Sequence, residues 1–338
     1  MPATIREVAQ KAGVGLGTVS RVLNDSPLVS AGTRARVQTA IAELDFRPNQ
    51  TARRLSLGKT LTIAAIVPFF TRPAFVERLR GVENTLIESE YDLILYNVET
   101  PERRDRCFRD VPHRERVDGV LVISLPPRAE DVEHLAKADV PVVLVDANHP
   151  ALTELNRIIT DDVAGGQRAV EHLIGLGHRR IGYISDPLET PFNFTSSRDR
   201  YQGYRQAHEA AGLPVRPEYQ AQGEHGRLPA RQLAAALLAL PEPPTAIFAA
   251  SDTQALGVLE AAKQAGCQVP GDLAVIGYDD VEIAEYAGLS TMRQQMFQSG
   301  QAGVELLLNV LAQPGRPAEC RTMPTELVIR QSTGPPRS

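Results

Sequence analysis

Polar side chains follow several apolar runs of the chain, at the points where buried strands would end. Asp146 comes directly after Val-Val-Leu-Val, Ser251 comes after Ala-Ile-Phe-Ala-Ala, and Asp279 comes after Val-Ile-Gly-Tyr. In a parallel sheet, ligands bind at the carboxyl ends of the strands. A carboxylate can accept hydrogen bonds from two hydroxyl groups, so a cluster of such side chains suits a hydroxyl-rich small molecule. We therefore expect Asp146, Ser251 and Asp279 to contact a ligand of that kind.

Aromatic residues near the same strand ends could give this site an apolar face. Phe69, Phe70 and Phe75 lie at the first strand–helix junction, and Phe192 and Tyr278 could lie opposite them. We expect Phe69 and Phe75 to touch the ligand. The phenylalanines could instead belong to the hydrophobic core, where this residue type is common.

Three further charged residues near the strand ends are interpreted as structural. Asp252 is predicted to cap the helix that follows it, and Asp280 could cap the next one. Arg72 precedes a proline at the first junction. Its charge at the mouth of a cleft would suit a phosphorylated or acidic ligand, but we favour an arginine that extends into solvent.

The apolar runs alternate with helical stretches over most of the chain. This alternation predicts a parallel α/β sheet, and its length suggests two such units. The runs expected to form strands are 62–67, 93–97, 119–123, 142–145, 181–184, 246–249 and 273–277, and the stretches expected to form helices are 75–89, 165–176, 198–211, 229–240 and 252–265.

Charge is distributed unevenly along the 338 residues. The formal net charge is −5, yet residues 1–60 carry nine Lys and Arg against four Asp and Glu. The remainder is therefore acidic. A basic first segment on an acidic body suits a chain whose first segment meets phosphate groups, although basic segments also occur for solubility alone.

The sequence contains no recognisable membrane or export signal. No apolar run reaches the roughly 18 residues that span a bilayer, and the first residues lack the apolar core of a secretion signal. The three cysteines, Cys107, Cys267 and Cys320, match no metal-binding spacing. We expect them to be free thiols in a cytoplasmic protein.

The first 46 residues carry the start and stop signals of three short helices. Thr4 and Glu7 form a capping-box pattern before the first helix, and Gly13 ends it. A second helix is predicted over about residues 16–23, and Ser30 caps a third. Two helices joined by a short turn with glycine are typical of a helix-turn-helix, whose second helix enters the major groove of DNA. From the spacing alone, a generic three-helix bundle without a DNA function would be the preferred interpretation.

The literal residues of this segment are more specific than its spacing. Four motifs occur in order: TIREVAQKAGV from Thr4, TVSRVLN from Thr18, TRARV from Thr33 and FRPN from Phe46. Together they closely resemble the LacI/GalR family of bacterial transcription factors, and the resemblance continues along essentially the whole chain. It implies a sequence-specific DNA-binding transcriptional regulator, in particular a repressor, and not an enzyme.

The resemblance assigns roles to the second helix. It implies that Leu16, Gly17 and Arg21 face base edges and that Thr18 and Ser20 lie near phosphates. Arg21 could donate a bidentate pair of hydrogen bonds to guanine, and Leu16 could touch a thymine methyl group. Gly17 departs from members that place a reading side chain there, because it offers nothing to a base and weakens the helix.

After the helix-turn-helix domain, 1–46, the resemblance implies a hinge helix and linker in 47–59. A helix this short is marginal by itself in water. In the family, two such segments fold against each other on DNA, and the leucine that matches Leu55 wedges into the minor groove. An ordinary basic linker is the alternative. The residues expected to contact DNA are Thr4, Leu16, Gly17, Thr18, Ser20, Arg21, Asn24, Asn49, Ala52, Arg53 and Leu55.

The remaining chain resembles the family's body, which is like a periplasmic sugar-binding protein. The resemblance implies two Rossmann-like lobes with parallel sheets and a cleft between them, in residues 60–332. The expected lobes are 60–159 with 289–319 and 160–288 with 320–332, followed by a disordered tail, 333–338.

One arginine is expected in the cleft from the resemblance alone. Arg200 lies in the string RDRYQG, which resembles the family segment whose arginine enters the cleft. An arginine can donate a fork of hydrogen bonds to neighbouring oxygens of a ligand. The expected effector contacts are therefore Phe69, Phe75, Asp146, Arg200, Ser251 and Asp279.

The implied partners are DNA, a second copy of the chain and a small molecule. A homodimer would match a near-palindromic double-stranded operator by symmetry, and the effector is expected to be a sugar. No cofactor, metal or membrane partner is expected. A solute-binding protein without a DNA function is the alternative, which the helix-turn-helix and hinge motifs disfavour. An enzyme is disfavoured because the sequence has no nucleophile elbow, metal-ligand spacing or phosphate loop.

Overall fold

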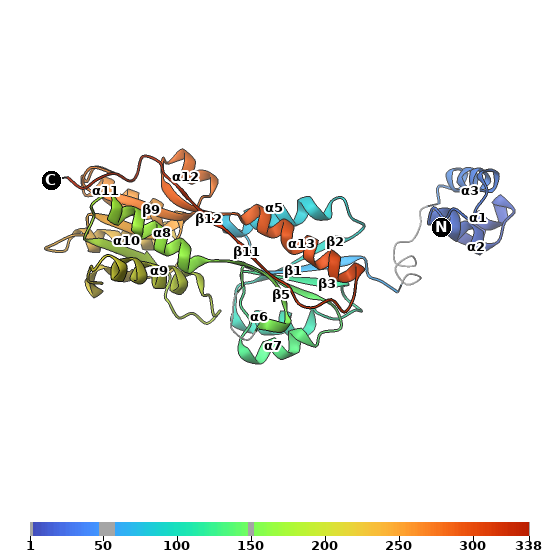
Figure 1. The fold of residues 1–338 in the computed structure, drawn as a ribbon. Helices are drawn as coiled ribbons and strands as arrows, with labels where there is room; N and C mark the ends of the chain where they lie inside the picture. Colours follow the sequence, from blue (N-terminus) through green and yellow to red (C-terminus); the bar gives the residue numbers. More distant parts are fainter. Residues whose placement is uncertain (1–2, 47–57, 148–151, 338) are drawn as a thin grey trace. The chain divides into compact units, whose positions relative to one another are not determined.

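The structure is a computed structural model that describes residues 3–46, 58–147 and 152–337. Contacts within the chain separate it into two units, Met1–Thr60 and Leu61–Ser338 (Figure 1). The first unit is helical and the second, the body, contains two sheets. None of the helices in the described part of the chain is both long and apolar enough to cross a membrane.

Capping groups set the limits of the helices in the first unit, as the sequence predicts. The Thr4 backbone N–H donates to the Glu7 carboxylate at 2.6 Å, and the Glu7 N–H donates to Thr4 Oγ1 at 3.4 Å. Gly13 ends the first helix with φ +64°, a conformation that glycine adopts without strain. Ser30 Oγ accepts the N–H of Thr33 at the start of the third. The helices are α1 (Ile5–Ala12), α2 (Leu16–Leu23) and α3 (Ala31–Glu43).

One small apolar core holds these three helices together. Val8 of α1, Val19 of α2 and Val37 of α3 are fully buried and belong to a single cluster. Burying both Val19 and Val22 fixes which side of α2 faces inward, so the other side of that helix is left exposed.

The first sheet of the body, with its helices, is named the N-lobe. Its strand order is β11-β5-β4-β3-β1-β2, and all neighbours are parallel. The central strands are buried along their whole length because helices cover both faces (Figure 1). Its elements are β1 (Thr62–Pro68), α5 (Pro73–Leu86), β2 (Asp92–Val98), α6 (Pro101–Asp110), β3 (Gly119–Ile123), α7 (Ala129–Ala136), β4 (Val142–Val145), β5 (Asn156–Thr160), α13 (Met296–Ala312) and β11 (Cys320–Met323).

The second sheet and its helices form the C-lobe. Its strand order is β12-β10-β9-β8-β6-β7, parallel except for the antiparallel edge strand β12. Its elements are α8 (Asp162–Gly175), β6 (Ile181–Ser185), α9 (Ser196–Ala210), β7 (Gln220–Gln222), α10 (Arg227–Leu238), β8 (Ala246–Ala249), α11 (Asp252–Gln264), β9 (Ala274–Asp279), α12 (Glu282–Tyr286), β10 (Ser290–Gln294) and β12 (Thr325–Val328). The predicted pair of α/β lobes is confirmed.

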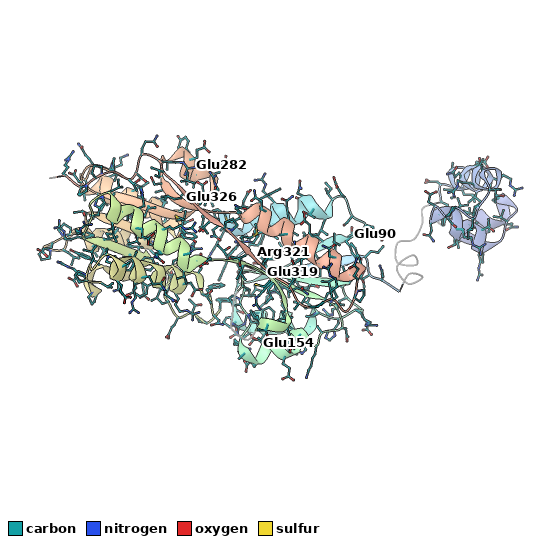
Figure 2. The ribbon with its side chains drawn as sticks, viewed as in Figure 1. Glu90, Glu154, Glu282, Glu319, Arg321 and Glu326 are labelled. Atoms are coloured by element: carbon teal, nitrogen blue, oxygen red, sulfur yellow. The ribbon has the colours of Figure 1, made fainter. Side chains whose placement is uncertain are left out.

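Within its described residues, the chain crosses between the lobes three times. The second and third crossings do not lie where the sequence predicts them, at 288/289 and 319/320. The strand β10 pairs with β9, so residues 290–294 belong to the C-lobe and the crossing follows them. The strand β11 pairs with β5, so residues 320–323 belong to the N-lobe. Figure 2 shows Glu319 and Arg321 on the N-lobe and Glu326 on the C-lobe, with the third crossing between Met323 and Thr325. Strand pairing decides these boundaries, and both strands are too polar to stand out in the sequence.

The expected disordered tail is also corrected, because residues 333–337 pack on the C-lobe. The Gly334 carbonyl lies 2.8 Å from His178 Nε2, and Arg337 pairs with Asp272 at 2.6 Å. Ser332, just before the tail, is buried and donates its hydroxyl to the Val275 carbonyl at 2.6 Å. These contacts fix the C-terminal residues along the end of the second sheet.

Candidate ligand pocket and nucleic-acid interface

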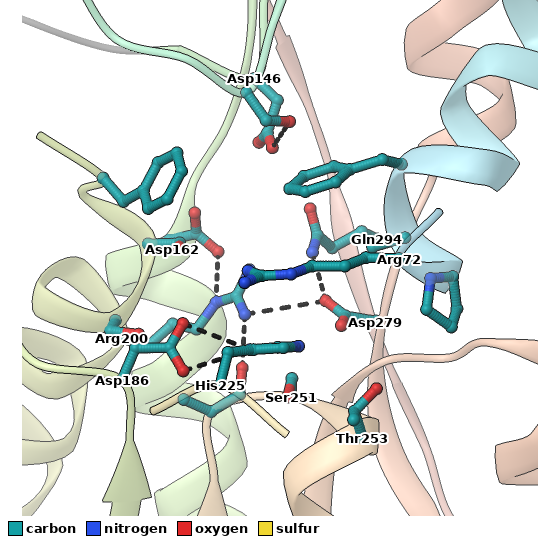
Figure 3. A pocket seen from close by; sticks show the side chains of 18 of the residues that line it. Arg72, Asp146, Asp162, Asp186, Arg200, His225, Ser251, Thr253, Asp279 and Gln294 are labelled. Carbon is teal, nitrogen blue, oxygen red and sulfur yellow. Dashed lines mark hydrogen bonds and ion pairs between the residues drawn. The ribbon is translucent and has the colours of Figure 1, made fainter. Parts of the chain in front are cut away.

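A pocket lies in the body between the N-lobe and the C-lobe, and side chains from both lobes line it (Figure 3). It sits at the carboxyl ends of strands, where a parallel α/β sheet binds its ligands. Asp146 follows β4, Asp186 follows β6 and Ser251 follows β8. Of the six residues that the sequence assigns to the effector, the pocket brings together Phe75, Asp146, Arg200, Ser251 and Asp279.

Arg200, near the start of α9, holds the C-lobe side of the pocket together. Its Nε donates to Asp162 Oδ1 at 2.8 Å, and its Nη1 lies 3.7 Å from Asp279 Oδ1 (Figure 3). The guanidinium also lies 3.7 Å above the ring centroid of Tyr278, a favourable cation–π geometry. Burial acts to lower the pKa of Arg200, but Asp162 and Asp279 outweigh it and raise that pKa. The arginine is therefore a fixed cation.

The two carboxylates beside Arg200 are buried. Burial raises the pKa of Asp162 to about 6, against the opposing effect of the Arg200 guanidinium. Burial likewise raises the pKa of Asp279, which accepts a hydrogen bond from Gln294 Nε2 at 2.6 Å. Asp279 also has φ +118°, a conformation rare for residues other than glycine. Strained backbone of this kind is found where the surrounding structure holds a functional side chain in place.

On the N-lobe side, Arg78 of α5 organises the pocket. Its Nη1 lies 3.0 Å from Asp146 Oδ2 and donates to Ser124 Oγ at 2.8 Å. Ser124 in turn donates to Asp146 Oδ2 at 2.7 Å. Only 1% of Arg78 is exposed, so this side of the ion pair is shielded from water and salt.

Gln294, at the end of β10, connects the two sides. Arg78 Nη2 donates to Gln294 Oε1 at 3.3 Å, while Gln294 Nε2 donates to Asp279 Oδ1. Continuous polar contacts therefore run from Asp146 in the N-lobe to Asp279 and Arg200 in the C-lobe. We name this set of five residues the interlobe chain. It connects the two walls of the pocket by hydrogen bonds and ion pairs.

Ser251, and not Asp252, caps α11. Ser251 Oγ accepts the N–H of Gln254 at 3.2 Å. Asp252 is instead the first helical residue and is fully buried, where it accepts from Val281 N–H at 3.0 Å and Thr291 Oγ1 at 2.6 Å. The predicted cap at Asp252 is therefore wrong, because its carboxylate accepts hydrogen bonds from these two donors, which are distant in sequence.

Asp280 likewise does not cap a helix. It pairs with Arg293 and Arg330, each at 2.7 Å, and it does not line the pocket. The helix α12 begins after Val281, whose side chain cannot accept a hydrogen bond.

The pocket lining includes one of the two phenylalanines expected to touch the ligand. Phe75 lines the pocket together with Phe194. Phe69 does not belong to the lining: its ring packs edge-on against Phe192, with centroids 5.3 Å apart, beside the N-lobe core. Phe69 is therefore not placed for direct contact with a ligand in this structure.

Several lining residues were missed by the sequence analysis. Asp186 follows a predicted strand, so the strand-end rule used for Asp146 could have found it. Asp162 follows the strand β5, whose residues Asn-Arg-Ile-Ile-Thr gave no such signal. Arg72, expected in solvent, is half-buried and lines the pocket. Other lining residues that were missed include Arg78, Ser124, His225, Thr253, Gln254 and Gln294.

The exposed side of α2 carries the side chains predicted to read DNA. Leu16 is 46% exposed, and Arg21 is exposed and makes no ion pair with any other described residue. Thr18 and Ser20 are half-buried, and Thr4, Gly17 and Asn24 are exposed. A Cβ at Gly17 would meet no atom within 4 Å, so this position has room for a side chain. The predicted hinge contacts Asn49, Ala52, Arg53 and Leu55 lie outside the described residues.

Two family models match the chain. The model for bacterial regulatory proteins of the lacI family matches residues 4–49, which include α1, α2 and α3. A model for a periplasmic binding protein-like domain matches residues 170–333 in the body.

The chain is also similar over nearly its whole length to proteins with known roles. It is 36% identical to the ribose operon repressor of Escherichia coli K12 over 92% of this chain and 94% of that protein. A lac repressor dimer bound to operator and an anti-inducer has a TM-score of 0.88 and 28% identity, covering 99% of this chain and 100% of that one. A complex of the transcriptional regulator CelR with cellobiose has a TM-score of 0.73 and 31% identity, covering 98% of this chain and 99% of that one.

The burial of Asp162 predicts a pH-dependent stability. Between about pH 4 and 6 the folded protein holds a proton on Asp162 that the unfolded chain releases, so its folding free energy becomes less favourable as pH rises through this window. In an Asp162→Asn variant this contribution is absent. The stability difference between wild type and variant should therefore change by about 1–3 kcal/mol in favour of the variant across the window.

Urea unfolding of both proteins between pH 4 and 7 measures this difference. Asp161→Asn, at the exposed neighbouring residue that caps α8, controls for the loss of a carboxylate at this helix terminus. A wild-type-to-Asp162→Asn difference that stays constant over the whole range would contradict the raised pKa of Asp162.

Proposed function

The chain belongs to the lacI family of bacterial regulatory proteins, and from this premise we propose that a sugar in the pocket between its lobes controls its binding to an operator. It is a DNA-binding transcriptional repressor and not an enzyme. Acting on the chromosome of a bacterium, it would work in the cytoplasm.

The observation that carries the effector proposal is the interlobe chain. A ligand changes a conformational equilibrium only when its contacts differ between the two states. Asp146 and Ser124 lie in one lobe, and Arg200, Asp279 and Ser251 lie in the other. A ligand that touches both groups favours one separation of the lobes over others. Effector binding in the body and operator binding by the helices are then linked as two sites of one equilibrium.

The chemistry of the lining favours a hydroxyl-rich effector. Ionised carboxylates accept hydrogen bonds from hydroxyl groups, and guanidinium groups donate to their oxygens. Ser196 and Ser197 add hydroxyl groups at the start of α9, and Phe75 and Phe194 offer apolar surface for the carbon face of a ring. The relatives named for ribose and cellobiose agree with this class of ligand.

For DNA we propose that α2 is the recognition helix and that Arg21 is its main base-reading residue. Its guanidinium can donate two hydrogen bonds to one guanine. Leu16 would add contact with a thymine methyl group, while Gly17 leaves the base beside it unread. Two copies of the chain would bind a near-palindromic operator, and Leu55 would act in the hinge between the helical unit and the body.

Replacing Arg21 with alanine should remove one position of sequence preference. Operator sites are first selected from a random duplex pool with the full-length chain, and affinity is then measured for the selected site and for unrelated DNA. We expect Arg21→Ala to lose about 1–3 kcal/mol on the selected site, with a much smaller change on unrelated DNA. Arg36→Ala, an exposed arginine of α3, is the matched control. Selection of the same sequence by Arg21→Ala would refute the assigned role.

Replacing Arg200 should lower the affinity of the body for its effector. Full-length chain is screened by thermal shift against monosaccharides, disaccharides, sugar phosphates, nucleosides and purines, and any stabilising compound is tested for its effect on operator binding. In Arg200→Lys, which keeps the charge, we expect the affinity for that compound to fall about 10- to 100-fold, because a charged hydrogen bond contributes about 1.5–3 kcal/mol. Arg198→Gln, an exposed neighbour on α9, should respond like wild type. An unchanged response in Arg200→Lys would place the effector elsewhere.

A further inference from the structure

Arg72 occupies a position in the pocket that the function described so far does not use. It directly precedes α5, and its carbonyl accepts the N–H groups of Phe75 and Val76 at 3.0 Å each. The Arg72 side chain takes no part in capping this helix. Figure 3 shows this side chain extending from the start of α5 toward the middle of the pocket, near Arg200. The guanidinium carbon lies 4.2 Å from the ring centroid of Phe69, which supports the side chain from one side.

The carboxylates that line the pocket are already engaged by other partners. Asp146 is held by Arg78, and Asp162 and Asp279 are held by Arg200. Asp186 lies 3.1 Å from His225 Nδ1 and accepts from Gln254 Nε2 at 2.9 Å.

Arg72, in contrast, makes no ion pair or side-chain hydrogen bond with any residue in the described part of the chain. Burial lowers the pKa of Arg72, while the charge of Asp186 acts in the opposite direction. A partly desolvated cation without a paired anion is unfavourable, and a ligand that supplies an anion would relieve that cost.

The same pocket is lined by a second residue that can donate a hydrogen bond, Ala74. Pro73 has no N–H, so the first free backbone donor of α5 is the N–H of Ala74, which lines the pocket and has no hydrogen-bond partner among the described residues. The N-terminus of a 14-residue helix also attracts negative charge. The planar fork of an arginine and a free helix N–H in the same pocket are suitable donors for a phosphate or a carboxylate.

We infer that the effector is an anionic sugar, a phosphate ester or a sugar acid, and that Arg72 binds its anionic group. This inference rests on the proposed function, in which the pocket holds the effector. The C-lobe residues around Arg200 then bind the hydroxyl groups, and Arg72 selects the charged compound over its neutral counterpart. Arg72 is thus a specificity-determining residue supplied by the N-lobe.

Matched pairs of ligands test this inference on the full-length chain. Binding of ribose and ribose 5-phosphate, of glucose and glucose 6-phosphate, and of glucuronate is measured by calorimetry at constant ionic strength. In wild type we expect one anionic compound to bind about 10- to 100-fold more tightly than its neutral counterpart, the factor that corresponds to a charged hydrogen bond. Preference for the phosphate esters or for glucuronate identifies the anionic group.

Substitutions of Arg72 distinguish direct binding of the anionic group by this residue from the effect of the overall positive charge. Arg72→Gln should reduce the affinity for the anionic compound to that for the neutral one, and Arg72→Lys should restore part of the difference. Both variants keep the backbone carbonyl that accepts at the start of α5, and their melting temperatures verify folding. Arg198→Gln removes an exposed arginine of α9 and should retain the preference of wild type.

The possible failures are distinguishable. Selective binding of a neutral sugar that Arg72→Gln does not alter would overturn the anionic assignment and leave the proposed sugar-controlled repressor intact. An anionic preference that survives in Arg72→Gln would overturn the role of Arg72. Absence of binding by every sugar tested, neutral or anionic, would overturn both this inference and the proposed function.

Discussion

The ion pair between Arg78 and Asp146, continued through Gln294 to Asp279 and Arg200, is the interaction on which the body depends. Arg78, Gln294, Asp279 and Arg200 are buried, so their contacts are strong and directional, and the loss of one partner leaves another buried polar group unpaired. The chain crosses from one lobe to the other immediately after Gln294. A small displacement at this glutamine therefore moves the pocket and the connection between the lobes together.

This arrangement explains how a small ligand can act on a large structure. Each lobe is a rigid sheet packed between helices, so the adjustable part of the body is the contact between the lobes. A ligand adds contacts on both sides of the pocket and so changes the free energy of one lobe arrangement relative to another. Arg72 would add to the N-lobe side of the pocket a contact that depends on the charge of the ligand.

The sequence predicts this site where the local pattern is strong and fails where long-range contacts decide. Asp146, Ser251 and Asp279 lie at the carboxyl ends of apolar strands, and the strand-end rule finds them. Asp162 follows β5, and Gln294 is the last residue of β10. The mixed composition of these two strands gives no strand signal, so neither these residues nor the lobe boundaries could be read from local patterns. Ser251 and Asp252 are both good capping residues, and only the donors Val281 and Thr291, distant in sequence, decide between them. Burial of Arg72 depends in the same way on how the tertiary structure forms the pocket.

The most direct test of this account is the coupling between the two ligands in a Gln294→Met variant, which keeps the volume of the side chain and removes both bridging hydrogen bonds. Operator affinity of the full-length chain is measured with and without the sugar found by thermal shift, for wild type, for Gln294→Met and for Gln301→Met on α13 as a control. The account predicts that the sugar changes operator affinity in wild type and in Gln301→Met, while in Gln294→Met the sugar still binds but operator affinity hardly changes. Full coupling in Gln294→Met, with the sugar bound as in wild type, would contradict the claim that the interlobe chain links the two sites.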